Sequence, residues 1–258
     1  MKFSVCIDAL FRHENLSLEE QLKRVKESGY EAFEFWSWWD KDLHQIKELK
    51  QQLGLHIACF CTKFESLTDA LRRPSYLQGL KDSIEAAQAL GCSMLITQAG
   101  SLLPGVPRHE LLESLVTGLK EADRLLEHSG ITLVLEPLNT RVDHPGYALD
   151  SSLEALQVLD EVGSSRIKVL FDAYHQQVMG EDIISIIRTH HDRIGAYHIA
   201  DAPGRHEIGS GEMDIYKLLE AIQKTGYDRY VGLEYFPLHD AAEGLSRFYR
   251  TFGSFERL

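Results

Sequence analysis

The sequence has little cysteine, and its cysteines do not have the spacing of a disulfide framework or of a zinc site. Cys6, Cys59, Cys61 and Cys92 all lie in apolar, strand-like runs. A C-x-C pair inside a strand differs from the C-x-x-C spacing of zinc-binding loops. We therefore expect four reduced cysteines in the protein core.

The sequence also lacks any long apolar run. No stretch approaches the roughly 20 apolar residues that a membrane-spanning helix needs. The first residues, MKFSVCIDALFRHE, do not contain the apolar segment of a signal peptide. These absences predict a cytoplasmic protein.

Positive charge is scarce as well. Asp and Glu number 39 against 27 Lys and Arg, which gives a formal net charge of −12. A surface of that sign repels phosphate backbones and anionic lipids, so we expect neither nucleic acid nor a membrane as partner. Hydrophobic residues make up 44% of the chain, which is enough for a large core and excludes disorder.

The chain does contain a repeated pattern of helix, glycine and strand. Each glycine of the pattern follows a segment of helical periodicity and precedes a strand-like run; the six are Gly29, Gly54, Gly91, Gly130, Gly163 and Gly226. Glycine after the last helical turn adopts the left-handed conformation that ends a helix. Six copies indicate a βα unit that is used repeatedly.

Eight strands are expected in all: Phe3–Ile7, Ala32–Trp36, His56–Cys61, Met94–Gln98, Thr132–Glu136, Ile167–Asp172, Ile194–Ile199 and Tyr230–Glu234. They are short and mostly continuous in apolar residues, as in a parallel sheet covered on both faces. Eight such units predict an α/β fold, a (β/α)8 TIM barrel with one domain over residues 1–258. The alternative, a doubly wound open sheet, usually has a glycine-rich turn after its first strand, and CIDALFRHE has none.

Four consecutive expected strands end in a side chain that can bind a metal. Glu136, Asp172, His198 and Glu234 follow one another at intervals of 36, 26 and 36 residues, each about one βα unit. In a TIM barrel the carboxyl ends of the strands carry the catalytic residues. A single acid at a strand end could pair with a nearby Lys or Arg, but four matched positions predict a shared site. Buried carboxylates repel one another unless a cation lies among them, so the set predicts a divalent ion, Mn²⁺, Mg²⁺, Co²⁺ or Zn²⁺.

Other polar and aromatic residues are placed to surround this site. His175 follows Asp172 by three residues and could bind a substrate oxygen or orient a metal ligand. Arg205 could hold a carboxylate or a hydroxyl, and its alternative role is a surface salt bridge. Glu34 and Trp36 end the second strand; Glu34 is expected to contact substrate or to form part of the wall. Trp36 belongs, with Trp38 and Trp39, to an aromatic group that either excludes water from a ligand or packs beneath a loop. Glu207 and Glu212 have no firm role.

Several segments resemble the xylose-isomerase-like TIM barrels and, within them, the hydroxypyruvate isomerase family. They are LVLEPLNTR, PGYAL, LFDAYHQQVM, GAYHIADAPGRHE, GSGEMD and YVGLEYFP, which cover the chain from about Gly130 to Pro237, with looser matches in SVCIDALF and GYEAFEFW. The resemblance implies a metal held by Glu136, Asp172, His198 and Glu234. It also implies that the two glutamates transfer protons and that His175 and Arg205 bind substrate. One departure is His198, because many hydroxypyruvate isomerases have glutamine there whereas ketose 3-epimerases have histidine.

The function expected from these residues is a metal-dependent ketol isomerisation of a small hydroxy-carbonyl compound, first of all hydroxypyruvate to tartronate semialdehyde. A ketose 3-epimerase or another sugar isomerase stays open, as does a non-catalytic sugar-binding protein. An abasic-site endonuclease of the same superfamily would need a basic track for DNA, which the acidic balance disfavours. A carboxylated substrate is compatible with Arg205 and Arg141, and barrels of this kind often associate as homo-oligomers through their helices.

Overall fold

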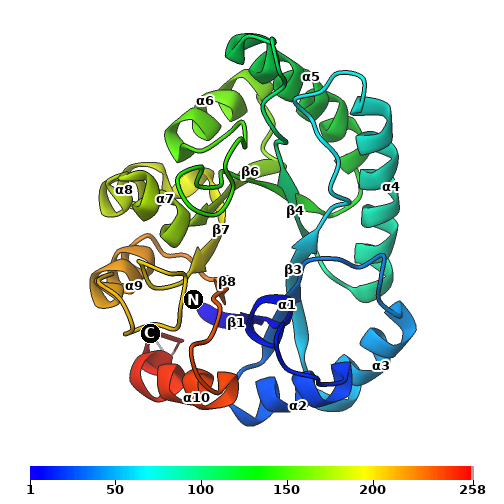
Figure 1. Ribbon diagram of the computed structural model, residues 1–258. Coiled ribbons are helices and arrows are strands. Elements are labelled where there is room, and N and C mark those ends of the chain that lie inside the picture. The colour runs from blue at the N-terminus through cyan, green and yellow to red at the C-terminus, as the bar shows by residue number, and fades with distance from the viewer. Residues whose placement is uncertain (257–258) are drawn as a thin grey trace.

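The computed structural model describes residues 1–256 and forms a closed barrel of parallel strands. The strands follow sequence order around the barrel, and β1 pairs with β8 to close it. Figure 1 shows the helices outside the ring of strands. The strands are β1 Lys2–Cys6, β2 Ala32–Phe35, β3 His56–Cys61, β4 Met94–Gln98, β5 Thr132–Glu136, β6 Ile167–Asp172, β7 Ile194–Ile199 and β8 Tyr230–Leu233. The prediction of an α/β TIM barrel is confirmed.

Helices lie between successive strands, and α10 and η2 follow the last strand. They are α1 Ile7–Leu10, α2 Leu18–Glu27, α3 Leu43–Leu53, α4 Arg73–Leu90, α5 Arg108–Leu126, α6 Ser152–Val162, α7 Ala173–Met179, α8 Ile183–His190, α9 Ile215–Lys224 and α10 Ala241–Phe252, with 3-10 helices η1 His191–Arg193 and η2 Gly253–Glu256. Within residues 1–256, no helix combines the length and the apolar character needed to cross a membrane.

The strand bounds agree closely with those expected from the sequence. The five strands from β3 to β7 have the expected ends, whereas β1 lies one residue earlier and β2 and β8 end one residue earlier. The end of β2 is set by Trp36, because its backbone N–H donates to Asp8 Oδ2 at 2.7 Å instead of continuing the strand. Glu234 lies just beyond β8, yet its N–H still donates to the carbonyl of Ile199 at 3.1 Å.

The prediction that the six glycines end helical segments is confirmed. All six glycines have positive φ, from 62° at Gly54 to 101° at Gly29. Gly54, Gly91 and Gly163 cap α3, α4 and α6 directly in the left-handed conformation. A side chain with a Cβ is strained there, so these positions favour glycine.

The barrel interior is apolar in its middle and becomes polar toward the carboxyl ends of the strands. A compact group inside the barrel consists of Cys59, Cys61, Met94, Ile96, Val134, Leu170 and Ala196. All four cysteines are buried and free, as expected. The two ends of the described chain meet beside β1, where the Phe3 N–H donates to Glu256 Oε1 at 2.8 Å.

Candidate active site

A cavity of about 740 Å³ opens at the carboxyl ends of the barrel strands. Glu136 from the end of β5 and Glu234 from just after β8 both line it. Arg205 and Trp36 lie on the same surface. This is the end of a TIM barrel at which active sites form, and the four residues all belong to the set expected from the sequence.

The structure brings the four strand-end residues together. Each of Glu136, Asp172, His198 and Glu234 offers one ligand atom, and these atoms lie within 4.8 Å of one another. The four lie at two depths: the glutamates face the cavity, whereas Asp172 and His198 are not part of its lining and are only 0% and 2% exposed. Asp172 is fixed further as the N-cap of α7, where its Oδ1 accepts the Tyr174 N–H at 2.8 Å.

The two glutamates have opposite electrostatic surroundings. Burial, and after it the charge of Glu234, raises the pKa of Glu136 to about 8. Burial would also raise the pKa of Glu234, but the charges of Arg205 and His198 outweigh it and hold that pKa well below its usual range. Two nearby carboxyl groups with pKa values pushed apart can serve as proton donor and proton acceptor.

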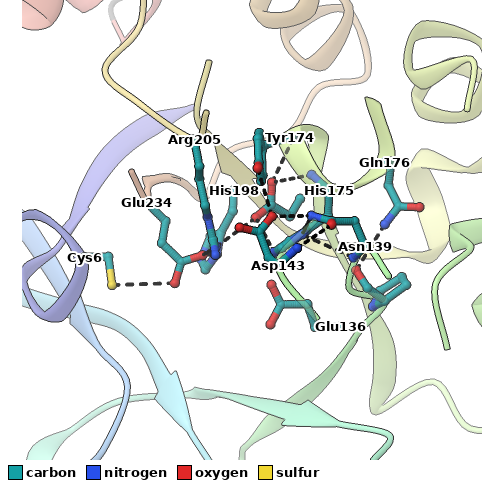
Figure 2. Close-up of polar contacts among 12 residues, drawn as sticks. Cys6, Glu136, Asn139, Asp143, Tyr174, His175, Gln176, His198, Arg205 and Glu234 are labelled. Carbon is teal, nitrogen blue, oxygen red and sulfur yellow. Dashed lines mark hydrogen bonds and ion pairs between the residues drawn. The ribbon is translucent and has the colours of Figure 1, made fainter. Parts of the chain in front are cut away.

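Arg205 provides a permanent positive charge beside the cluster. Its Nη2 donates to Glu234 Oε2 at 2.6 Å and lies 3.5 Å from Asp172 Oδ2 (Figure 2). The guanidinium is flanked by the rings of Tyr174 and Phe236, at 5.6 and 5.4 Å from their centroids. Arg205 is buried and has a φ of 57°, a left-handed backbone that is uncommon for arginine and often marks a functional site. The surface salt bridge considered for Arg205 is therefore a buried ion pair.

His175 is buried beside the cluster, and one of its two ring nitrogens, Nδ1, accepts a hydrogen bond. Its Nδ1 accepts the backbone N–H of Asn139 at 3.2 Å, so Nε2 carries the proton. Within residues 1–256, Nε2 has no hydrogen-bond partner, although Asp172 Oδ2 lies 3.5 Å away. Burial, and after it the charge of Arg205, lowers the pKa of His175 well below 6.5, which keeps the ring neutral. His175 is fully buried and, like Glu34, is absent from the cavity lining, so its Nε2–H lies beneath the space that a substrate would fill.

Glu34 and Trp36 occupy different levels of the barrel, although both come from the end of β2. Trp36 lines the cavity, and its Nε1 donates to Glu234 Oε1 at 2.5 Å. Glu34 is absent from the cavity lining and lies below the cluster, where its Oε2 is 2.8 Å from His198 Nε2. The structure therefore places Glu34 against a cluster residue and away from the space that a substrate would fill.

The other residues considered from the sequence lie away from the four strand-end residues. Arg141 is exposed and donates to the carbonyl of Val178 at 3.1 Å, outside the cavity lining. Glu207 is buried and accepts the Leu238 N–H at 2.9 Å, which joins two loops, while Glu212 is exposed. Trp38 donates to Ser83 Oγ at 3.0 Å and does not line the cavity.

Sequence reasoning missed a supporting network around His175. Asp143 Oδ2 accepts from the amide of Asn139 at 2.6 Å and from the hydroxyl of Tyr174 at 2.8 Å. Asn139 in turn contacts His175, and Tyr174 flanks Arg205. The only signal for this network was the polar NTR segment, which begins three residues after Glu136.

The donor set fits a divalent cation. It combines three carboxylates with one imidazole, and the charges of Arg205 and His198 together balance only part of the negative charge. The Glu136 carboxylate forms no hydrogen bond with any residue from Met1 to Glu256, and its raised pKa reflects the cost of an ionised form at this place. Mixed oxygen and nitrogen ligands of this kind suit Mn²⁺, Mg²⁺, Co²⁺ or Zn²⁺.

A closed parallel barrel with a buried cluster of acids and histidine at its strand ends defines the class of the protein. The chain matches the model of the xylose isomerase-like TIM barrel family over residues 22–252, and it belongs to that family. Its relatives include a putative hydroxypyruvate isomerase of Mus musculus, 30% identical over 95% of this chain and 93% of that protein. Another is a hydroxypyruvate isomerase of Escherichia coli (strain K12), 28% identical over 95% of this chain and 97% of that protein. These relatives support the expected class of enzyme, an isomerase.

Solved structures agree on the fold. A structure described as an AP endonuclease, family 2, from Brucella melitensis has a TM-score of 0.91 and 26% identity, and the match covers 97% of this chain and 99% of that one. A structure of the IOLI protein with a bound zinc atom has a TM-score of 0.82 and 20% identity over 99% and 98% of the two chains. Structural neighbours of this barrel thus include a protein that binds metal.

Proposed function

We propose that the protein is a metal-dependent ketol isomerase of a small hydroxy-carbonyl compound, with hydroxypyruvate to tartronate semialdehyde as the leading reaction. The observation that carries this proposal is the pair Glu136 and Glu234, which line the cavity while their ligand atoms lie within 4.8 Å of those of Asp172 and His198. The name of the Escherichia coli relative supports the choice of substrate.

The same four residues would hold one divalent cation. Mn²⁺, Mg²⁺, Co²⁺ and Zn²⁺ all suit this donor set, and the zinc-containing structural neighbour is consistent with a cation in such a barrel. When bound, the cation would act as a Lewis acid that makes the hydrogen next to the substrate carbonyl more acidic.

The two glutamates then carry the proton. One carboxylate takes a proton from C3 of hydroxypyruvate, which leaves an enediolate of the substrate. The other carboxyl group returns a proton to C2, while the hydroxyl proton moves from the oxygen on C3 to the oxygen on C2. The product is tartronate semialdehyde, and no oxidant or reductant is consumed. The opposite pKa directions of Glu136 and Glu234 suit this exchange.

Two further residues would orient the substrate. The guanidinium of Arg205 reaches the cavity beside Glu234 and can bind a substrate carboxylate. The free Nε2–H of His175 lies beneath the cavity lining and would donate only to a substrate oxygen that enters deeper than that lining. Both roles are those expected from the family resemblance.

A ketose 3-epimerase is the second candidate, and the cavity volume favours it. A cavity of about 740 Å³ is larger than a three-carbon acid requires and is within the range of pockets for larger ligands. The same pair of glutamates would serve, with the proton returned to the opposite face of the same carbon. A non-catalytic sugar-binding protein is disfavoured because both glutamates are present and face the cavity.

Proton NMR in D₂O tests the proposal directly. Metal-stripped protein is mixed with hydroxypyruvate and then receives Mg²⁺, or Mn²⁺ at a level too low to broaden the spectrum. We expect metal-dependent loss of substrate and deuterium on C2 of the product. Glu136→Gln and Glu234→Gln should each remove most of the turnover, whereas the exposed Glu212→Gln should keep it.

Full turnover in either glutamate variant would contradict the proton-transfer assignment. Metal binding without any reaction of hydroxypyruvate would reject that substrate and leave the epimerase. The same experiment on ketopentoses and ketohexoses would then decide between the two reactions.

A further inference from the structure

A fourth buried carboxylate, that of Glu34, lies directly beneath the four-residue cluster. Glu34 in β2 is 3% exposed, and its Oε2 is 2.8 Å from His198 Nε2. Its other oxygen, Oε1, accepts a hydrogen bond from the hydroxyl of Ser4 in β1. Glu34 is therefore held between Ser4 and His198 at a level that the active-site cavity does not reach.

A glycine in β8, Gly232, leaves room for the contact between Glu34 and His198. Gly232 in β8 is the register partner of both Ser4 and His198. A Cβ at Gly232 would lie 2.6 Å from Glu34 Oε1 and 2.6 Å from His198 Cδ2. A neighbouring strand thus lacks a side chain at the place where Glu34 and His198 meet, and the contact is built into the packing of the barrel.

The two ring nitrogens of His198 face different carboxylates. Nε2 faces Glu34 below, whereas Nδ1 faces the cluster and lies 3.1 Å from Glu234 Oε2. A carboxylate that accepts from one ring nitrogen fixes the proton on that nitrogen and directs the lone pair of the other toward a metal. Of the two nitrogens, Nδ1 is the one that contacts a member of the four-residue cluster, Glu234.

We propose that Glu34 is a positioning residue: it holds the Nε2–H of His198, so that Nδ1 is the nitrogen presented to a divalent cation. This inference rests on the metal site of the proposed function. It assigns Glu34 to the support of a metal ligand, whereas the sequence had suggested a substrate contact. Outer carboxylates of this kind typically change metal affinity or activity by 10- to 100-fold when they are removed.

The alternative to a positioning role is a second metal site formed by Glu34, His198 and Cys59. Glu34, Cys59 and His198 also have ligand atoms within 4.8 Å of one another. A separate cavity of about 360 Å³ reaches all three from the amino ends of the strands. A second metal ion at this place would need Nε2 of His198 as a ligand, which is the nitrogen that Glu34 already occupies. The two roles are therefore exclusive, and a metal titration distinguishes them.

The test uses Mn²⁺ alone as the probe, without substrate. Free Mn²⁺ is measured by its EPR signal during titration of metal-stripped wild type, Glu34→Gln and Glu34→Ala. We expect one site in the wild type and a dissociation constant about 10- to 100-fold higher in Glu34→Ala. Glu34→Gln has nearly the same shape and keeps an oxygen that can accept from Nε2, so its loss should be smaller. This variant also keeps the test valid if Glu34→Ala does not fold.

A spectroscopic readout separates positioning from a general effect on the fold. In Zn²⁺-loaded protein labelled with ¹⁵N-histidine, His198 of the wild type should show a protonated Nε2 and a metal-bound Nδ1. Glu34→Ala should show a mixture of tautomers. The control is Glu181→Gln, which removes a carboxylate that also accepts hydrogen bonds from serine hydroxyls, those of Ser151 and Ser152, away from the cluster. It should leave both Mn²⁺ affinity and the His198 signal unchanged.

The outcomes are distinguishable from a failure of the proposed function. Unchanged Mn²⁺ affinity and an unchanged His198 tautomer in folded Glu34→Ala would overturn the inference. A raised KM as the only change would instead support a contact between Glu34 and the substrate. A second bound Mn²⁺ that Cys59→Ser removes would replace it with a second metal site. If the wild type binds Mn²⁺ but does not convert hydroxypyruvate, only the proposed substrate fails.

Discussion

The pKa of Glu136 gives a quantitative prediction for the metal-stripped protein. Burial, and after it the charge of Glu234, raises this pKa from 4.5 to about 8. A carboxyl group with a higher pKa in the folded than in the unfolded state binds its proton more tightly when folded. Its contribution to stability is therefore complete below about pH 4.5 and is lost as the pH rises to about 8. The whole difference corresponds to about 5 kcal/mol at about 1.36 kcal/mol per pH unit.

Glu136→Gln removes this proton linkage and keeps the shape of the side chain. Urea unfolding of both proteins with a chelator, from about pH 5 to about pH 9, gives the free energy of unfolding at each pH. The free energy of unfolding of wild type minus that of the variant should fall by about 2–3 kcal/mol between pH 5 and pH 8. This is less than the whole difference because the fold relaxes around a buried charge. Saturating Mn²⁺ should abolish this fall, because a cation favours the ionised carboxylate. A difference that does not change with pH in chelator would show that folded Glu136 does not hold its proton more tightly than the unfolded chain does.

Three substitutions extend the test to other parts of the site. Arg205→Met removes the 2.6 Å ion pair with Glu234. The free energy of unfolding of the metal-stripped protein in urea should therefore fall by about 3 kcal/mol, and Mn²⁺ should restore part of it. No loss would mean that the pair is not formed. Trp36→Phe removes the 2.5 Å hydrogen bond to Glu234 and should lower kcat about 10-fold in steady-state assays, with little change in Tm; an unchanged kcat would exclude this contact from the reaction. Gly232→Ala places a Cβ 2.6 Å from His198 Cδ2, so thermal unfolding should show a loss of about 1–3 kcal/mol and titration should show weaker Mn²⁺ binding; wild-type values would indicate that the barrel has more space than the packing suggests.

The strand-end residues could be predicted from the sequence because each breaks a strong local pattern. An apolar run that ends in an acid or a histidine is conspicuous, and the barrel fold converts four such endings into one cluster. Glu136, Asp172, His198 and Glu234 therefore gathered as expected, although their chemical roles remain proposals.

The level of Glu34 could not be predicted in the same way. Glu34 and Trp36 are two residues apart, so strand periodicity places both side chains on the same face of β2. The direction of the strand places Trp36 nearer the mouth of the barrel, but the sequence does not show whether Glu34 also reaches it, because that depends on where the neighbouring strands end. The register of β2 against β3 also shifts between Phe33 and Phe35. Asn139 and Asp143 escaped prediction because loops have no periodicity that relates them to His175.

The two depths of the four-residue cluster have a consequence for how such a barrel acquires a new substrate. Asp172 and His198 lie below the cavity and are held by β6 and β7. The surface above them comes largely from loops, through residues such as Phe64, Leu103, His144 and Phe236. Loop side chains can be exchanged without moving the ends of strands. Selection can therefore change what the cavity accepts while the strand-end cluster is inherited intact, and a directed search for new specificity should begin with the loops.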